Sequence, residues 1–425
     1  MTLTKKSISE IIFLGLFIST GLIPNYGALD RIATQWLYLS IINTLGLIYV
    51  LYEKKDSLIF KKSIRFKPFI FLIGFIIWGL ISYLYALNQD EVIVKTIRWV
   101  QLPLSLFILM NFFQNNYLHY VKAISIGVSI ILLFELYFTY STYFQLTQYK
   151  PYDFSYAYIL KGATGNKNIN AASLLIKIPF LIYLIYQFKN HIVKYFLTII
   201  LIFTSYLVFI LSSRSSIISF FIILTIVILK YIYLSAKNKT LIKDISYFLI
   251  LSGLSFSLLL FAVNFSGNNS ASIIKRASTI NTEDTSTQQR LRFYQHSFDQ
   301  LLENPLIGVG LGNWKIKSID YDKEDVVGYT IPYHTHNDFL EISTELGIIG
   351  LTLYLLIFIF PFFDLFKYKE KKKIINVNSI ILFAGIIYFV DANLNFPHAR
   401  PVMQIPFILI LVLAFIKTNN KLKDA

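Results

Sequence analysis

Residues 201–230 read LIFTSYLVFILSSRSSIISFFIILTIVILK, and this stretch decides the fold. Two continuous apolar runs flank the polar segment Ser212-Ser213-Arg214-Ser215-Ser216. With its neighbours, each run extends to about 20 residues, the length that a helix needs to cross the hydrocarbon core of a bilayer. The stretch therefore predicts two membrane-spanning helices joined by a very short turn.

The composition of the whole chain indicates the same class of protein. Of the 425 residues, 55% are hydrophobic and 15% are charged, whereas a soluble domain carries about 25% charged residues. There are enough apolar residues for about twelve spanning helices of roughly 20 residues each. A soluble enzyme with one core is excluded, and the continuous runs exclude the alternating pattern of an outer-membrane barrel. The chain has no cysteine, which excludes disulfides and thiolate metal sites.

The apolar runs predict an all-α, polytopic membrane protein in which residues 1–425 form a single transmembrane domain. Lys5 and Lys6 precede the first run and no clear cleavage site follows it, so we expect a retained signal anchor. The fourth helix is the least regular, because Lys95 and Arg98 lie inside it. The twelve predicted helices lie near 8–24, 36–52, 68–87, 95–113, 121–144, 171–188, 194–212, 215–233, 245–265, 338–366, 374–392 and 402–417.

The positive charges set the expected orientation. Lysines and arginines concentrate in the connections 53–67 and 367–373, which the positive-inside rule places in the cytoplasm. With twelve helices, the N and C termini also lie on the cytoplasmic side of a bacterial inner membrane. The net charge of +15 then mostly reflects the lysines and arginines that orient the helices in the membrane. We therefore expect no nucleic-acid partner.

Two connections on the opposite, periplasmic side are long, 145–170 and 266–337. The cytoplasmic connections are all short, so we expect the active site on the periplasmic face. The long periplasmic loop 266–337, between the ninth and tenth helices, contains a predicted amphipathic helix over 287–303. On a helical wheel, one face of this helix is apolar and is expected to pack on the protein. That face consists of Leu291, Tyr294, Phe298, Leu301 and Leu302.

The same wheel assigns different surroundings to the two arginines of this helix. Arg290 borders the apolar face, so we expect it to point toward the membrane domain. Arg292 lies on the opposite face together with acidic residues, so we expect it to point to solvent.

The long loop continues with two weak motifs. Residues 308–314 read GVGLGNW, but a phosphate-binding loop needs a preceding strand and a following helix. We expect neither here, so the segment is predicted to be a tight turn. The acidic run 320–325 contains an Asp-x-Asp spacing that can hold a divalent ion on a nucleotide sugar. Nucleotide sugars are not expected outside the cell membrane, so a solvated loop is the preferred interpretation.

The loop ends in His334-Thr335-His336-Asn337-Asp338. Asn337 is a good N-cap for the tenth helix, which places His336 at the membrane–water boundary. His334 and His336 offer two metal ligands, but no third ligand is evident nearby, so we predict no metal site. The other chemistry available to histidine near neutral pH is general-base catalysis. Glu345 lies inside the apolar start of the helix, where a carboxylate needs a partner and is a functional candidate.

Several further cations are expected at the same level of the periplasmic face. Arginine can bind phosphate oxygens through two hydrogen bonds at once, so such a group suits an anionic lipid headgroup. The alternative is that these side chains only extend to the headgroup region of the bilayer. The candidates are Arg214 in the short turn, Lys95 and Arg98 in the fourth helix, Lys167 before the sixth, and Arg400 beside His398 in the last periplasmic loop.

Three segments together resemble the O-antigen ligase and O-antigen polymerase superfamily of bacterial membrane proteins. The first is Ser213-Arg214-Ser215 at the start of a span. The second is Arg290, which lies fifteen residues before residues 305–310 (PLIGVG). The third is residues 336–340 (HNDFL) followed by residues 345–350 (ELGIIG). The motif region covers roughly residues 200–365, and outside it the resemblance lies in the number of spans and the placement of the loops.

The resemblance implies a glycosyltransferase that uses a glycan donor linked to undecaprenyl diphosphate. Its ligase members join this glycan to a sugar hydroxyl of lipid A–core on the periplasmic side, and are thought to need no metal or other cofactor. By position, the family's catalytic histidine corresponds to His336, and its two arginines correspond to Arg214 and Arg290. The expected partners are the lipid-linked donor, a glycolipid or glycan acceptor, and membrane lipids. The remaining candidates for substrate binding are His334, Lys167, Arg98, Glu345 and Arg400.

Three alternative functions stay open at this stage. An O-antigen polymerase would use the same donor but extend a second lipid-linked glycan. A protein O-oligosaccharyltransferase is less favoured, because no soluble extension follows Lys417. A transporter or flippase would be expected to carry charged or broken helices at mid-membrane and paired repeats. Here the charges lie toward one face, no repeat is evident, and Glu135 in the fifth helix is the main exception.

Overall fold

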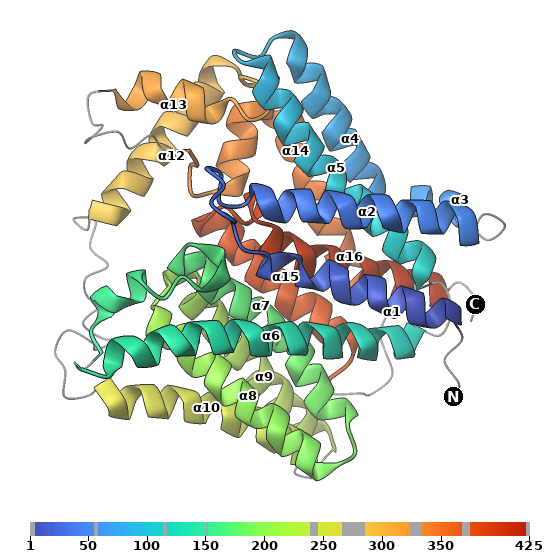
Figure 1. The fold of residues 1–425 in the computed structure, drawn as a ribbon, viewed down its shortest axis with the longest axis vertical. Helices are drawn as coiled ribbons and strands as arrows, with labels where there is room; N and C mark the ends of the chain where they lie inside the picture. Colours follow the sequence, from blue (N-terminus) through green and yellow to red (C-terminus); the bar gives the residue numbers. More distant parts are fainter. Residues whose placement is uncertain are drawn as a thin grey trace.

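The computed structural model describes residues 5–54, 58–113, 117–149, 152–238, 245–265, 285–323, 333–367 and 375–421, and these are all-α with no strand. The helices pack as one bundle (Figure 1). The long helices are α1 (Lys5–Ile18), α2 (Ala33–Glu53), α4 (Lys67–Ile81), α5 (Gln89–Phe112), α6 (Tyr117–Thr147), α7 (Lys167–Gln187), α8 (His191–Leu211), α9 (Arg214–Asn238), α10 (Ile245–Phe265), α12 (Thr285–Glu303), α14 (Asp338–Lys367), α15 (Val377–Leu394) and α16 (Pro401–Lys421). The short elements are η1 (Ser19–Leu22), α3 (Phe60–Arg65), η3 (Ser82–Leu84), η4 (Phe154–Tyr158), η5 (Gly162–Thr164), α13 (Trp314–Asp322) and η6 (Pro397–Ala399).

Ten helices in the described part of the chain are long and apolar enough to cross a membrane. They coincide with ten of the twelve predicted spans. The other two predicted spans correspond to shorter apolar helices, Ile8–Leu22 and Phe248–Ala262. The predicted class, a polytopic all-α membrane protein, is thereby confirmed.

The chain begins and ends at the same side of the bundle. The start of α1, the end of α16 and α3 lie at the right of Figure 1, while α12 lies at the left. The lysine-rich connection 53–67 is therefore opposite the long loop, as the charge pattern predicts. Parts of the predicted connections, including Glu324, Asp325 and most of 367–373, lie outside the described residues. Which end of the bundle faces the cytoplasm stays a prediction.

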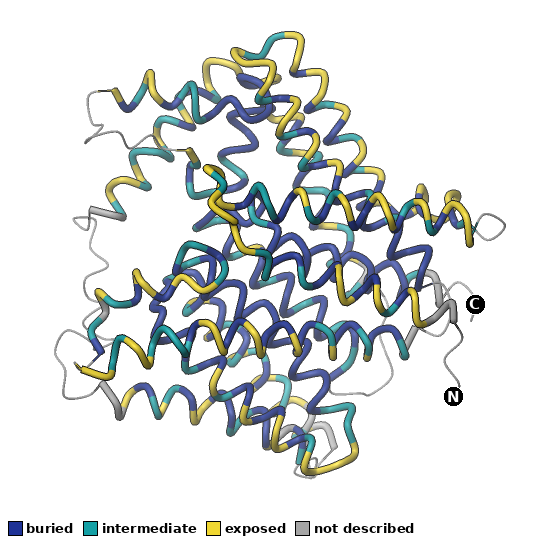
Figure 2. Tube along the Cα trace, viewed as in Figure 1, coloured by how far each residue is buried: buried dark blue, intermediate teal, exposed yellow. Residues whose placement is uncertain are grey.

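Two helices form the centre of the bundle. Of an 18-residue apolar segment in each helix, 94% is buried in α7 and in α16, compared with 33% in α9. Both α7 and α16 appear as mostly dark segments in Figure 2. This fits their sequences, because a helix that is apolar on all sides must be enclosed or face lipid. The buried Glu135 of α6 is explained by a partner on α7, since Lys177 Nζ lies 2.9 Å from its carboxylate.

Helix α14 is interrupted at Gly347, whose backbone has φ 64° and ψ −169°. The interruption leaves carbonyl groups of the preceding turn without partners in their own helix. The turn formed by residues 305–314 supplies some of the missing donors: Val309 N donates to Thr344 O at 3.1 Å, and Gly310 N donates to Glu345 O at 2.8 Å. In the opposite direction, Ile348 N donates to Pro305 O at 2.9 Å.

The glycines permit this close approach of two backbones. A Cβ atom on Gly347 would lie 2.2 Å from the carbonyl carbon of Leu306, and one on Gly308 would lie 2.4 Å from that of Glu345. Both glycines have positive φ angles, which other residues adopt only with strain. We refer to this contact between the 305–314 turn and the break in α14 as the glycine joint. The segment is a turn as predicted, but a helix does follow it, since α13 begins at Trp314.

Replacing Gly347 by alanine is expected to destabilise the folded protein strongly. Essentially only glycine adopts a backbone with φ 64° and ψ −169°, which costs another residue roughly 1–3 kcal/mol, and the steric conflict with Leu306 adds to this cost. The thermal midpoint of the purified protein in detergent should fall and the folded yield should drop. Gly15→Ala is the matched control, because a Cβ there meets nothing within 4 Å. Equal midpoints for the two variants would contradict the joint.

Candidate active site

Two neighbouring cavities lie where α5, α9, α12 and the start of α14 converge. The large cavity has a volume of about 1170 Å³ and the small cavity one of about 220 Å³. Both are lined by Gln289, Phe293 and His336, so His336 lies at the boundary between them. Every site residue predicted from the sequence lines at least one of the two. The small cavity contains Lys167, Arg214, Arg290 and His336, and the large cavity contains Arg98, His334, His336, Glu345 and Arg400.

Arg214 owes its position to the short turn between α8 and α9. Ser212 ends α8 in the left-handed conformation, with φ 49°, so α9 can begin at once with Arg214. The guanidinium Nη1 donates to Thr287 Oγ1 on α12 at 2.7 Å. This bond ties the short turn to the helix that carries Arg290.

A cluster of buried polar side chains connects this turn to α15. Ser215 Oγ donates to Asp391 Oδ1 at 2.9 Å, and Asn395 Nδ2 donates to both Asp391 Oδ1 and Ser215 Oγ, at 2.6 and 3.0 Å. All three side chains are buried. Asp391 Oδ2 has no hydrogen-bond partner among the described residues, but the bonds that join Asp391 Oδ1, Ser215 and Asn395 connect the start of α9 to the end of α15. No motif in the sequence marks Asp391 or Asn395.

Helix α12 reaches from Arg214 to the start of α14. The Tyr294 hydroxyl donates to His336 O at 3.1 Å and also lies 3.2 Å from Asn393 O. Burial raises the pKa of Tyr294, so the hydroxyl stays protonated and remains a donor. Arg290 lies one turn earlier and lines the small cavity, which agrees with its predicted direction toward the membrane domain.

The predicted environment of Arg292 is wrong. Its side chain is 29% exposed, and Nε lies 2.7 Å from Asp322 Oδ1. Asp322 itself is buried, so the prediction of a solvated acidic run is also wrong at this residue. Both side chains line the large cavity. The return of the chain through α13, which the wheel of α12 alone cannot show, brings a carboxylate to the arginine.

The predicted buried face of α12 needs a second correction. Leu291, Phe298 and Leu302 are 50%, 49% and 64% exposed, whereas Ser297 and Gln300 are fully buried. Thr344 Oγ1 of α14 donates to Ser297 O at 3.1 Å. The wheel assumed that apolar residues must face the protein. In a membrane protein the surroundings can be apolar as well, so an exposed apolar face carries no such requirement.

The N-terminus of α14 is capped as predicted. Asn337 Oδ1 accepts hydrogen bonds from Phe339 N and Leu340 N at 3.0 and 3.1 Å. His336 precedes the cap and has a left-handed backbone, with φ 61°, an arrangement that is sparsely populated and found often at functional sites. The ring of His336 packs edge-on to Phe396, with 5.1 Å between ring centroids.

The imidazole of His336 is neutral at physiological pH. Burial, together with the charge of the nearby Arg290 guanidinium, lowers its pKa to about 3. A neutral ring retains a nitrogen lone pair that can accept a proton or a hydrogen bond. This nitrogen is available at the place where the two cavities meet.

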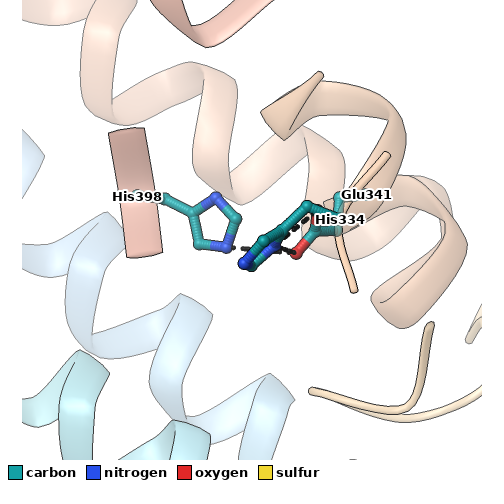
Figure 3. A group of neighbouring side chains, drawn as sticks. All are labelled: His334, Glu341 and His398. Atoms are coloured by element: carbon teal, nitrogen blue, oxygen red, sulfur yellow. Dashed lines mark hydrogen bonds and ion pairs between the residues drawn. The ribbon is translucent and has the colours of Figure 1, made fainter. Parts of the chain in front are cut away.

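His334 belongs to a buried network that the sequence did not predict (Figure 3). Its Nδ1 lies 3.0 Å from Glu341 Oε1, and His398 Nε2 lies 3.3 Å from the same oxygen. His398 Nδ1 in turn lies 2.7 Å from Asp338 Oδ1. Thr335 N donates to the second oxygen of Glu341 at 3.1 Å. The network links the His-x-His segment, the first turn of α14 and η6.

His334, Glu341 and His398 also offer the donor types of a transition-metal site, since one ligand atom from each lies within 4.8 Å of the others. The expectation that His334 has no third ligand nearby is therefore wrong. The two carboxylates around His398 raise its pKa to about 9 against the opposing effect of burial. At neutral pH the three groups therefore form a charged hydrogen-bond network.

Glu345 has the partners that its position requires. Its Oε1 accepts from Trp314 N at 3.3 Å, across the glycine joint. Lys95 acts on it electrostatically and also lies 3.9 Å from Glu341. One signal in the sequence identifies the missed acids Asp338 and Glu341: together with Glu345 they are spaced i, i+3 and i+7 on one face of a membrane helix.

The motif region can now be compared with known proteins. Residues 199–355 match the O-antigen ligase family. The match contains both catalytic arginine candidates, the glycine joint and the His-x-His segment, and it confirms the resemblance inferred from the motifs. Outside 199–355, the large cavity is completed by residues 29–32 before α2, by Asn166, by α5 and by the segment before α16.

Two curated relatives carry the name "Putative polysaccharide ligase". The protein from Rickettsia conorii is 35% identical over 98 residues, and the one from Rickettsia typhi is 32% identical over 96 residues. Each alignment covers 22% of this chain and 22% of the relative. The similarity is thus confined to a segment of both proteins.

The charge on His398 is expected to make the stability of the protein depend on pH. Its folded pKa of about 9 lies above the ordinary value of about 6.5. The stabilisation, on the order of a few kcal/mol, is therefore complete below the ordinary pKa and is lost as the pH rises through about 9. The difference in thermal midpoint between wild type and His398→Gln should be largest near pH 6 and shrink toward alkaline pH.

The exposed His191 at the start of α8 provides the control, because His191→Gln should show no such trend. A difference between wild type and His398→Gln that stays constant across the whole pH range would contradict the charged network.

Proposed function

We propose that the protein is a glycosyltransferase of the O-antigen ligase type. It moves a glycan from an undecaprenyl-diphosphate carrier to a sugar hydroxyl of a lipid A–core acceptor, at the periplasmic face of the bacterial inner membrane. One observation carries the proposal: His336, with a neutral imidazole, lies between a small cavity lined by cations and a large cavity. The match of residues 199–355 to the O-antigen ligase family supports it.

The small cavity fits the diphosphate of the donor. Arg214, Arg290 and Lys167 line it, and no acidic residue is among its lining residues. Guanidinium groups bind phosphate oxygens through paired hydrogen bonds. When the bond from the sugar to the phosphate breaks, the diphosphate gains negative charge, and fixed cations stabilise that charge in the transition state.

The large cavity is left for the acceptor. The acceptor oxygen attacks the anomeric carbon, a carbon–oxygen bond forms there, and the bond from that carbon to the diphosphate oxygen breaks. The departing diphosphate keeps the electron pair. The proton of the acceptor hydroxyl passes to the neutral imidazole of His336. The donor bond is already activated, so the transfer needs no nucleotide and no metal.

Binding of the donor would make His336 a stronger base. Besides burial, the charge of Arg290 holds the pKa of His336 low. A bound diphosphate would offset that charge, because an anion close to a titratable ring favours its protonated form. His336 would accept a proton more readily with the donor in place than without it.

The ligase and the polymerase differ in their acceptors. The names of the matched family and of the Rickettsia proteins favour the ligase. Purified protein should be given lipid-linked glycan together with either lipid A–core or a second lipid-linked glycan, and the products should be separated. Transfer to lipid A–core supports the proposal. Chain extension alone would show a polymerase, and the absence of any glycan transfer would favour a transporter.

Arg214→Ala and Arg290→Ala should each lower kcat by about 10²–10³-fold, the usual loss for one group that stabilises transition-state charge. Arg292 is unsuitable as a control, because it lines the large cavity and pairs with Asp322. Lys317→Ala on α13 is better matched, since Lys317 pairs with Asp320 and lines neither cavity. Similar losses in all three variants at equal expression would argue against a diphosphate subsite.

His336→Ala should lose transfer, by about 10²–10⁴-fold for a general base, while the protein still inserts and binds the lipid-linked donor. The measurement is transfer against pH for wild type, His334→Ala and His336→Ala, with and without EDTA. Full activity in His336→Ala would exclude it as the base. Inactivation by EDTA that a divalent ion reverses would instead favour a metal role for the two histidines.

A further inference from the structure

We propose that the large cavity contains an anion-binding subsite, formed by Arg31, Arg98 and Arg400, that selects acceptor glycans bearing a phosphate or carboxylate group. This inference rests on the proposed function, because it assigns the large cavity to the acceptor. The subsite is distinct from the small cavity, which holds other cations and shares only Gln289, Phe293 and His336 with the large one.

The charges that line the large cavity do not balance. Six side chains are cationic (Arg31, Lys95, Arg98, Arg292, Lys315 and Arg400) and four are acidic (Asp30, Glu91, Asp322 and Glu345), which leaves an excess of two positive charges. Like charges gathered in a partly enclosed space repel one another, and the repulsion is weakly screened. An excess of this kind is relieved by a bound anion.

The pairing of these side chains shows where the excess lies. Glu91 lies 2.7 Å from Lys315, and Asp322 lies 2.7 Å from Arg292. Glu345 faces Lys95, whose charge acts on it. These three acids therefore have cations of their own, and the excess belongs to the group around Asp30.

Asp30 is the one acid of the large cavity that is left for Arg31, Arg98 and Arg400, the three remaining cations of its lining. Its Oδ2 accepts from Arg98 Nη2 at 2.6 Å, and the charge of Arg400 also acts on it. One carboxylate is therefore close to Arg98 and Arg400, the charge of Arg31 acts in turn on Arg400, and neither Arg31 nor Arg400 has an ion-pair partner among the described residues.

Arg400 is the clearest member of the subsite. Its Nε is buried and has no hydrogen-bond partner among the described residues. Its guanidinium lies over the ring of Phe396, 4.9 Å from the centroid, which holds the plane of the group in place. Burial, together with the charges of Arg98 and Arg31, lowers the pKa of Arg400 to about 10. The group thus stays charged at neutral pH in unfavourable surroundings.

The three arginines come from separate parts of the chain. Arg31 precedes α2, Arg98 lies on α5, and Arg400 lies between η6 and α16. A side chain that only extends to lipid headgroups needs no such convergence around a cavity. Guanidinium groups bind both phosphate and carboxylate with paired hydrogen bonds, so the ligand class is an anionic sugar rather than one particular glycan.

The position of the subsite gives it a role in the choice of acceptor. His336 and His334 line the same cavity. An acidic group held by Arg31, Arg98 and Arg400 would fix the acceptor glycan at one point while a neighbouring hydroxyl lies at His336. Neutral glycans would lack that anchor and would bind more weakly.

The first experiment measures binding without relying on transfer. Wild-type protein in nanodiscs of uncharged-headgroup lipid is treated with phenylglyoxal, which modifies arginine, and the modification of each arginine is followed by peptide mass spectrometry. Glucose 6-phosphate and glucuronate should both slow the modification of Arg31, Arg98 and Arg400, and glucose should not. Protection by one of the two anions alone would assign the subsite to that group. Absence of protection by either, or equal protection by glucose, would overturn the proposal.

The second experiment measures transfer to lipid A–core before and after its phosphate groups are removed. Arg400→Gln and Arg31→Gln should raise KM for the phosphorylated acceptor by about tenfold, the usual effect of one lost charge-assisted hydrogen bond, with little change for the dephosphorylated one. Arg400→Lys should retain part of the preference, and Lys317→Gln should retain all of it. Equal losses with both acceptors, or a loss of affinity for the donor, would overturn the proposal.

The two experiments separate the subsite from the proposed function. Protection of the arginines by sugar anions without any transfer would leave the subsite in place and remove the ligase assignment. Transfer with no dependence on acceptor charge would leave the ligase in place and remove the subsite.

Discussion

The glycine joint is the contact on which the rest of the site depends. The break at Gly347 frees backbone carbonyls of α14, and the 305–314 turn and the indole of Trp78 satisfy them. Buried carbonyls without partners are costly, most of all where no water reaches them. The joint therefore fixes the first half of α14, with its acids and the preceding histidines, against α4 and the end of α12. The joint also gives residues 305–310 and 344–348 a common structural role, since each segment supplies hydrogen-bond partners for backbone groups of the other.

Around this joint, charge is distributed by a simple rule. Ionisable groups that face the interior are paired, as in the Glu135–Lys177 pair and the network from Asp338 to His334. Cations in excess of the acids face a cavity instead. Burying a charge is costly, so an excess of cations over acids is a meaningful observation in a protein of this kind. In the small cavity they suit a diphosphate, and in the large cavity they suit an acidic glycan, with His336 between the two.

The sequence predictions were correct for features that depend on neighbouring residues and wrong for features that depend on contacts between distant segments. The helices were predictable because each span is set by its own apolar residues. The cap at Asn337 was predictable because it is formed within four residues. The helical wheel of α12 predicted that Arg290 points toward the membrane domain and that Arg292 points to solvent. The second prediction was wrong, because α13 brings Asp322 to Arg292 and a wheel of α12 alone cannot show this contact. The exposed Leu291, Phe298 and Leu302 show that an apolar face need not indicate packing in a membrane protein.

The sequence by itself determined the class of protein, the number and approximate limits of its helices, the expected side of its long loop, and the residues of the motif region. These features depend on local composition and on short-range hydrogen bonds. Only the tertiary structure decided that Glu341 and His398 join His334, and that Arg31, Arg98 and Arg400 line one cavity with Asp30. Those groups come from separate helices, and the meeting of charged side chains across a bundle depends on how the helices pack, which no local pattern encodes.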